Sequence, residues 1–248
     1  MNRIEATFEQ LKAQRAKAFI AYLMVGYPSV KVLPSLVKGL ESSGVDLIEL
    51  GIPFSDPLAD GPTIQAASSW ALRRGVTPRT VLASVRTLRR QGVKIPLVLM
   101  TYVNPVTQYG MAAFCKDAAQ AGVDGLIIPD LPPEEAGEWV AAARRSRLST
   151  IFLAAPTSPK RRLRRIAARS TGFIYYVSLT GVTGARARLP KAIASHVRSI
   201  RGMTRLPICV GFGISKPAQV REIARVADGV IVGSALLNVL GKSKRNPV

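Results

Sequence analysis

The sequence predicts a (β/α)8 barrel with an extra helix at its N-terminus. Short apolar, β-branched runs alternate with helix-like segments along the whole chain, and no change in composition divides its 248 residues. No G-x-G-x-x-G motif follows the first run, where a dinucleotide-binding fold would place its phosphate loop. Strict alternation favours parallel strands joined by right-handed crossovers. We therefore expect residues 1–248 to form one TIM barrel domain, with a doubly wound open sheet as the alternative.

An amphipathic N-terminal helix precedes the first strand, because Ile4, Phe8 and Leu11 recur at helical spacing among charged residues. The segments between the apolar runs, such as VLPSLVKGLESSG, also have helical periodicity and end at glycine, as helix C-termini commonly do. The tail over about 241–248 is charged and contains proline, so we expect it to be disordered. The eight candidate strands are 18–26, 46–52, 95–102, 125–130, 150–156, 173–179, 206–213 and 228–235.

The composition indicates a folded cytoplasmic protein. Hydrophobic residues make up 48% of the chain, which supplies a substantial core. No uninterrupted apolar run of about 18 residues is present, and the N-terminal segment lacks the apolar centre of a signal peptide. Cys115 and Cys209 lie far apart without a CxxC spacing, so we expect two buried thiols rather than a disulfide or a zinc site.

The net charge of +20 is distributed unevenly, with +5 on residues 1–124 and +15 on residues 125–248. The densest cluster is KRRLRRIAARS at 160–170. It contains no aromatic residue for stacking on bases, and Leu163 and Ile166 lie on one helical face. A solvated, arginine-rich helix face is therefore favoured over a nucleic-acid site, and we expect neither a nucleic-acid nor a membrane partner.

The C-terminal ends of the strands hold the chemistry in barrels of this type. In the run 46–52, alternation places Ile48 and Leu50 on one face and Glu49 on the other, so Glu49 points into the barrel near its mouth. Desolvation would raise its pKa toward the range of a general acid or base at neutral pH. The alternative is a structural glutamate paired with an internal base, but the other candidate strands supply no lysine or arginine. The polar residues at the strand ends are Tyr22, Glu49, Asp56, Asp60, Tyr102, Asn104, Asp130 and Tyr175.

Asp60 is ambiguous from its position in PLADGP. It either faces the same mouth or serves as a turn residue or N-cap for the helix TIQAASSWALRR. Asp56 has the same two interpretations within SDP. His196 is the only histidine and falls in a predicted helix, so neither a Ser-His-Asp triad nor a metal site is indicated.

Glycine-rich stretches at 181–184, 211–213 and 233–234 follow the last three candidate strands. Exposed backbone N–H groups there, with a helix beginning after Gly233, form a typical phosphate site of such barrels. The alternative is that these glycines serve turns alone. Together these features indicate a small phosphorylated substrate, one or two carboxylates for proton transfer, and no required cofactor.

Several motifs closely resemble the alpha subunit of tryptophan synthase over about residues 3–240. They are ELGIPFSDPLADGPTIQ, IIPDLPPEE, GVTGAR, GFGIS and VGSA, in this order. The resemblance implies a lyase of tryptophan biosynthesis that cleaves indole-3-glycerol phosphate to indole and glyceraldehyde 3-phosphate. It makes Glu49 the acid/base catalyst and Asp60 the carboxylate that accepts a hydrogen bond from the indole N–H group.

The resemblance also assigns further positions. Thr183 belongs to a mobile loop that closes the site, and Leu179 stands where some members carry arginine at the start of that loop. The positions that match substrate-binding residues are Tyr22, Tyr175, Thr183, Gly184, Gly213, Gly233 and Ser234.

The implied partner is a beta subunit that contains pyridoxal phosphate (PLP) and receives indole through a tunnel in an alpha2beta2 complex. This chain itself would hold no cofactor. The face toward the partner would include Pro53, Asp56, Asn104 and Pro132. Two alternatives remain: a stand-alone indole-releasing lyase with the same site, and a non-catalytic barrel that acts as a binding or allosteric partner.

Overall fold

The computed structural model describes residues 2–177, 192–211 and 213–242, and these form a barrel of parallel strands. Each of the eight candidate strands contributes to one sheet with the order β5-β4-β3-β2-β1-β9-β8-β7-β6. The strands are β1 Ala18–Met24, β2 Leu47–Gly51, β3 Leu97–Met100, β4 Gly125–Ile127, β5 Ser149–Ile151, β6 Leu153–Ala154, β7 Ile174–Val177, β8 Ile208–Gly211 and β9 Gly229–Val232.

The barrel closes at Phe152, which separates β5 from β6. On one side β5 pairs with β4, and on the other β6 pairs with β7. The Tyr175 N–H donates to the Phe152 carbonyl at 3.1 Å, which continues the ladder across the interruption. The two strands at the ends of the sheet order are therefore halves of one predicted strand, 150–156. The predicted barrel is confirmed, and the open-sheet alternative is wrong.

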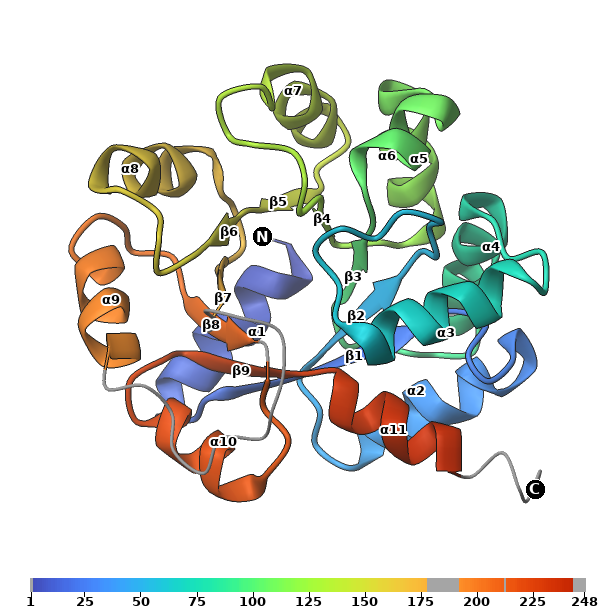
Figure 1. Ribbon diagram of the computed structural model, residues 1–248, viewed down its shortest axis with the longest axis horizontal. Helices are drawn as coiled ribbons and strands as arrows, with labels where there is room; N and C mark the ends of the chain where they lie inside the picture. Colours follow the sequence, from blue (N-terminus) through green and yellow to red (C-terminus); the bar gives the residue numbers. More distant parts are fainter. Residues whose placement is uncertain (1, 178–191, 212, 243–248) are drawn as a thin grey trace.

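Helices surround the strands (Figure 1). Strand β2 is followed by two helices, α3 and α4, and β3 is followed by α5 and α6. The turn before α2 is a short 3-10 helix, Val30–Val32. The α-helices are α1 Arg3–Ala13, α2 Leu33–Ser42, α3 Pro62–Leu72, α4 Pro78–Arg90, α5 Val103–Tyr109, α6 Met111–Ala121, α7 Gly137–Arg145, α8 Lys160–Arg169, α9 Ala192–Arg201, α10 Pro217–Ala224 and α11 Ser234–Lys242.

The extra N-terminal helix α1 covers the N-terminal end of the barrel, and its predicted apolar face is buried. Phe8 packs on Phe173 with ring centroids 5.9 Å apart. Ile4 lies against Gly125, where an added Cβ atom would approach its side chain to 3.0 Å. Because α1 closes this end, the opposite, C-terminal end of the barrel is left as the mouth.

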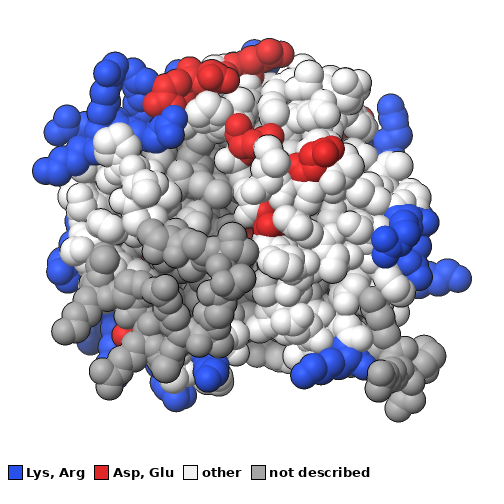
Figure 2. Space-filling view, viewed as in Figure 1, with Lys and Arg blue, Asp and Glu red and all other residues white. Residues whose placement is uncertain are grey.

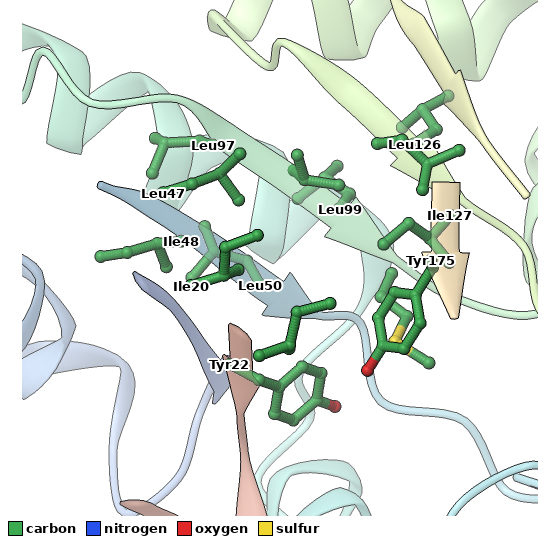
Figure 3. Packing of buried hydrophobic residues seen from close by; sticks show 14 of the residues in the cluster. Ile20, Tyr22, Leu47, Ile48, Leu50, Leu97, Leu99, Leu126, Ile127 and Tyr175 are labelled. Atoms are coloured by element: carbon green, nitrogen blue, oxygen red, sulfur yellow. The ribbon is translucent and has the colours of Figure 1, made fainter. Parts of the chain in front are cut away.

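Alternation along the strands separates an outer and an inner face, as predicted. Residues paired across parallel strands share a face, so the register Tyr22↔Glu49↔Val98 places these three inside the barrel. Ile48 and Leu50 lie on the other face and are fully buried. Figure 3 shows part of this packing, with aliphatic side chains filling the space around β2.

Four further expectations concern positions outside the barrel mouth. Both cysteines are free and buried, as predicted. His196 lies on α9, where its Nδ1 atom is 2.7 Å from the Tyr176 hydroxyl. On α8, Leu163 and Ile166 are buried while most of the basic side chains are exposed, as expected of a solvated helix face. Helix α11 includes the first two residues of the tail 241–248, and the other six lie outside the described residues.

Within the ranges that the structure describes, no helix is long and apolar enough to cross a lipid bilayer.

Candidate active site

Glu49 is the central acidic group of the barrel mouth. It lies on β2 with no exposed surface, and neither carboxyl oxygen has a hydrogen-bond partner among the described residues. Burial without a compensating charge raises the pKa of Glu49 to about 8. The structural alternative required an internal base that holds Glu49, and the described residues contain no such base next to it. A carboxyl group in this state carries a proton near neutral pH that it can donate.

Asp60 faces the same mouth from the loop between β2 and α3. Its Oδ1 atom is buried and has no partner within the described part of the chain. Desolvation raises the pKa of Asp60 to about 6, and a hydrogen bond from Tyr102 limits the increase. The N-cap of α3 is Gly61, so the capping role considered for Asp60 is excluded. The carboxyl group of Asp60 is thus more readily ionised than that of Glu49.

Tyr102 positions this loop, a role that sequence reasoning did not assign. It lies two residues after the end of β3 and is buried, and its hydroxyl oxygen accepts a hydrogen bond from the Ala59 N–H at 3.1 Å. The same hydroxyl group lies close enough to the Asp60 carboxylate to lower the pKa of that acid. Its ring packs on Phe54, with centroids 5.4 Å apart. The sequence feature that could have identified Tyr102 was its position at the end of a predicted strand, next to the strand that carries Glu49.

Tyr22 and Tyr175 form the walls of the mouth. Both are buried, and Figure 3 shows their hydroxyl groups turned toward the same space from β1 and β7. The pKa of each phenol is raised, first by burial and then by the nearby carboxyl groups of Glu49 and Asp60. Gly211 provides room for the Tyr175 side chain, because a Cβ atom at this position would overlap the phenol ring. The structure thus brings two tyrosines and two acids together.

The predicted phosphate residues lie on neighbouring strand ends. Gly213 follows β8 with a φ of +73°, a conformation that side chains other than glycine rarely adopt. Gly233 follows β9 and lies against Tyr22, and Ser234 begins α11. The N-terminal end of α11 therefore lies at the same mouth. Thr183, Gly184 and Leu179 lie outside the described residues.

The residues expected at a partner surface surround the outside of this mouth. Asp56 and Asn104 are exposed and Pro132 is half-buried, whereas Pro53 is buried beneath its loop. Leu58, in the same loop as Asp56 and Asp60, is 87% exposed, which is unusual for a large apolar side chain. The loop that carries Asp60 therefore continues directly into the outer surface.

Comparison with known proteins agrees with this geometry. The sequence model of the tryptophan synthase alpha chain family matches residues 8–248. The tryptophan synthase alpha chain of Geotalea daltonii is 52% identical over 237 residues, which are 96% of this chain and 89% of that protein.

Solved structures show the same relationship. A crystal structure of tryptophan synthase subunit alpha from Legionella pneumophila is 40% identical, with a TM-score of 0.92, and the match covers 99% of this chain and 91% of that one. A structure of Mycobacterium tuberculosis tryptophan synthase is 44% identical, with a TM-score of 0.90 and coverages of 97% and 92%. Given the whole-chain match, the shared barrel and the acids at its mouth, this chain belongs to the tryptophan synthase alpha chain family.

Proposed function

We propose that Glu49 and Asp60 are the catalytic pair for the reaction of this family, the retro-aldol cleavage of indole-3-glycerol phosphate to indole and glyceraldehyde 3-phosphate. The observation that carries the assignment is the buried, unpaired Glu49 carboxyl group, whose pKa is raised to about 8. Asp60 lies at the same mouth with a pKa of about 6. Near neutral pH the pair therefore consists of one protonated and one ionised carboxyl group.

The two protonation states match the two needs of the reaction. Glu49 donates its proton to the indole ring carbon that carries the glycerol chain, and positive charge develops on the ring. The ionised Asp60 accepts a hydrogen bond from the indole N–H group and stabilises that charge. The glycerol hydroxyl next to the ring then loses its proton to Glu49 as the carbon–carbon bond breaks. The products are indole and an aldehyde, and Glu49 regains its starting proton.

The surrounding residues hold the substrate in this orientation. Tyr22 and Tyr175 would contact the indole ring and the glycerol chain, since their hydroxyl groups face one space and both phenols lie near the carboxyl groups of Glu49 and Asp60. Gly213, Gly233 and Ser234 would bind the phosphate through backbone N–H groups and the N-terminal end of α11, together with Gly184. Thr183 would close over the site. None of these steps requires a cofactor in this chain.

The partner proposed for this chain is a PLP-containing beta subunit that takes up the indole in the cytoplasm, in an alpha2beta2 complex. The exposed Leu58 and Asp56, with Asn104 and Pro132, would meet it. Figure 2 looks onto the barrel mouth and shows the largest gathering of Lys and Arg side chains at its edge, over α8. That basic surface is set apart from the mouth, so we expect it to leave docking unobstructed.

The test is indole release from indole-3-glycerol phosphate by the purified chain, with and without a beta subunit and beside the Glu49→Gln variant. We expect slow release that rises with the partner and falls roughly a thousandfold, or about 4 kcal/mol in barrier, in the variant. A variant that retains about a tenth of the turnover or more would remove Glu49 from its role.

The same experiment separates the alternatives. Fast release that does not respond to the partner would identify a stand-alone lyase. No release under either condition would identify a barrel that keeps the site without the activity.

A further inference from the structure

A second hollow lies at the N-terminal end of the barrel, on the opposite side from the mouth. Its volume is about 990 Å³, the upper end of the range for small-molecule sites. It is lined by the start of α1, the start of β5 and the ends of α7 and α8. Figure 1 shows α7 and α8 as neighbours on the rim of the barrel.

Most of the charged residues that line the hollow are arginines. Arg3, Arg144, Arg147 and Arg169 all contribute to it, against two acids, Glu5 and Asp124. Of these two acids, only Asp124 forms ion pairs among the described residues. The Asp124 carboxylate binds Arg3 at 2.8 Å and Arg89 at 2.5 Å, and a Glu5 oxygen accepts a hydrogen bond from the Asn2 N–H.

Three of these arginines are left without a counter-ion. Within the described ranges no carboxylate lies within 4.0 Å of Arg144, Arg147 or Arg169, and Arg169 is also half-buried. By contrast, Arg162 and Arg165 on the outer face of α8 share Glu134. Among the described residues, the hollow thus gathers more arginines than acids.

Interaction with helix dipoles explains the positions of two of these three arginines. Arg144 and Arg169 are in the last turns of α7 and α8, where a cation interacts favourably with the helix dipole. Arg147 lies beyond the end of α7, in the turn that leads to β5. That interaction is worth about 1 kcal/mol or less at an exposed site and leaves the guanidinium N–H groups free to bind a ligand.

We propose that this hollow is a binding site for a small anion that carries two or three phosphate groups. Guanidinium groups bind phosphate oxygens through paired N–H donors, and three of them match a chain of phosphates better than a single one. The site is separate from the mouth, so it differs from the phosphate site of the substrate.

The test is calorimetric titration of the full chain with inorganic tripolyphosphate at about 0.15 M salt, where weak surface attraction is screened. We expect saturable binding at one site. The triple variant Arg144→Gln, Arg147→Gln, Arg169→Gln should weaken it by at least about tenfold. Thermal unfolding of each variant without ligand checks that the barrel is intact.

The matched control removes the same charge from another surface of the molecule. Lys160→Gln, Arg161→Gln and Arg164→Gln neutralise three exposed side chains on α8 for which no ion pair is seen in the described residues. We expect this variant to weaken binding by less than about threefold. An equal loss in both variants would show that tripolyphosphate responds to net charge alone and would overturn the proposal, as would the absence of saturable binding.

The two sources of such a ligand are distinguished with the same protein. Adenosine triphosphate and tripolyphosphate are titrated side by side into the native chain. Equal affinity for the two ligands would show that the phosphate chain alone is sufficient for binding. Tighter binding of the nucleotide would show that the nucleoside occupies the rest of the hollow. Loss of both in the Arg144, Arg147 and Arg169 variant is required in either case.

Discussion

Each end of the barrel buries a carboxyl group, and the two groups differ in whether they have hydrogen-bond partners among the described residues. Asp124, at the N-terminal end, is 4% exposed and accepts hydrogen bonds from Arg3, Arg89 and the Leu97 N–H group. Glu49, at the mouth, has no exposed surface and no partner among the described residues. The comparison shows that one fold can satisfy a buried carboxyl group at one end and leave another unsatisfied at the opposite end. A satisfied carboxylate fixes structure, whereas an unsatisfied one keeps a raised pKa that a reaction can use.

The largest effect on stability is expected at Asp124. Asp124→Ala leaves Arg89, which is largely buried, without its counter-ion and removes the bond to the Leu97 N–H. Breaking a buried pair in this way costs about 3 kcal/mol, which denaturant unfolding would detect. Glu134→Ala, which removes exposed ion pairs on α8, should leave the unfolding midpoint nearly unchanged. Equal losses in the two variants would mean that the N-terminal end is not specially stabilised by Asp124.

The next prediction tests the role of Asp60 at the mouth. Asp60→Asn removes the negative charge that stabilises the developing positive charge, so we expect turnover to fall about a hundredfold, or about 2.7 kcal/mol. The measurement is indole release by the isolated chain. Asp56→Asn changes an exposed carboxylate of the same loop and should retain the rate. Normal turnover in Asp60→Asn would return Asp60 to a structural role.

The third prediction concerns the cost of keeping Glu49 buried. Its pKa is about 8 in the folded protein and 4.5 in a model peptide. Between these values the folded state retains a proton that the unfolded state loses, so the stability of the native protein falls as the pH rises through this window. The Glu49→Gln variant has no carboxyl group at this position, so its stability does not fall with pH for this reason. Its stability relative to the native chain should increase by on the order of 3 kcal/mol between about pH 5 and pH 8, measured by denaturant unfolding. A difference that does not change with pH would place the Glu49 carboxyl in contact with water or a base.

The smallest effect is expected at Tyr102, which supports Asp60. In the native chain kcat/KM should rise through about pH 6 as Asp60 ionises and fall through about pH 8 as Glu49 loses its proton. Tyr102→Phe removes a hydrogen bond that lowers the pKa of Asp60. The acidic limb of the profile should therefore move to higher pH, and the rate at neutral pH should fall about tenfold, or about 1.4 kcal/mol.

A matched control for Tyr102 exists on another surface. Tyr109 donates a hydrogen bond to Asp117 at 2.6 Å, and both lie on helices outside the barrel. Tyr109→Phe removes an equivalent bond between a phenol and a carboxylate, so its pH profile should match that of the native chain. A shift of the acidic limb in both variants would assign the effect to general loss of stability.

Much of the fold could be predicted because it depends on local patterns. All eight candidate strands are present, and the N-terminal helix buries the three apolar residues whose spacing predicted it. The break at Phe152 could not be predicted, because it depends on how β4 and β7 meet when the barrel closes. Likewise, the inward direction of Glu49 followed from alternation, whereas the role of Asp60 required the observation that Gly61 caps α3.

Local residue patterns set the alternation of strands and helices, the acid in β2 and the glycines at the strand ends, because periodicity and residue type act over a few neighbouring positions. Which buried carboxyl groups find hydrogen-bond partners depends instead on contacts between distant parts of the chain. Arg3 and Arg89 reach Asp124 from positions more than thirty residues away in the chain, while in the described chain no base reaches Glu49. The desolvation that raises the pKa of Glu49 exists only after the barrel has closed, and it depends on all of the strands at once.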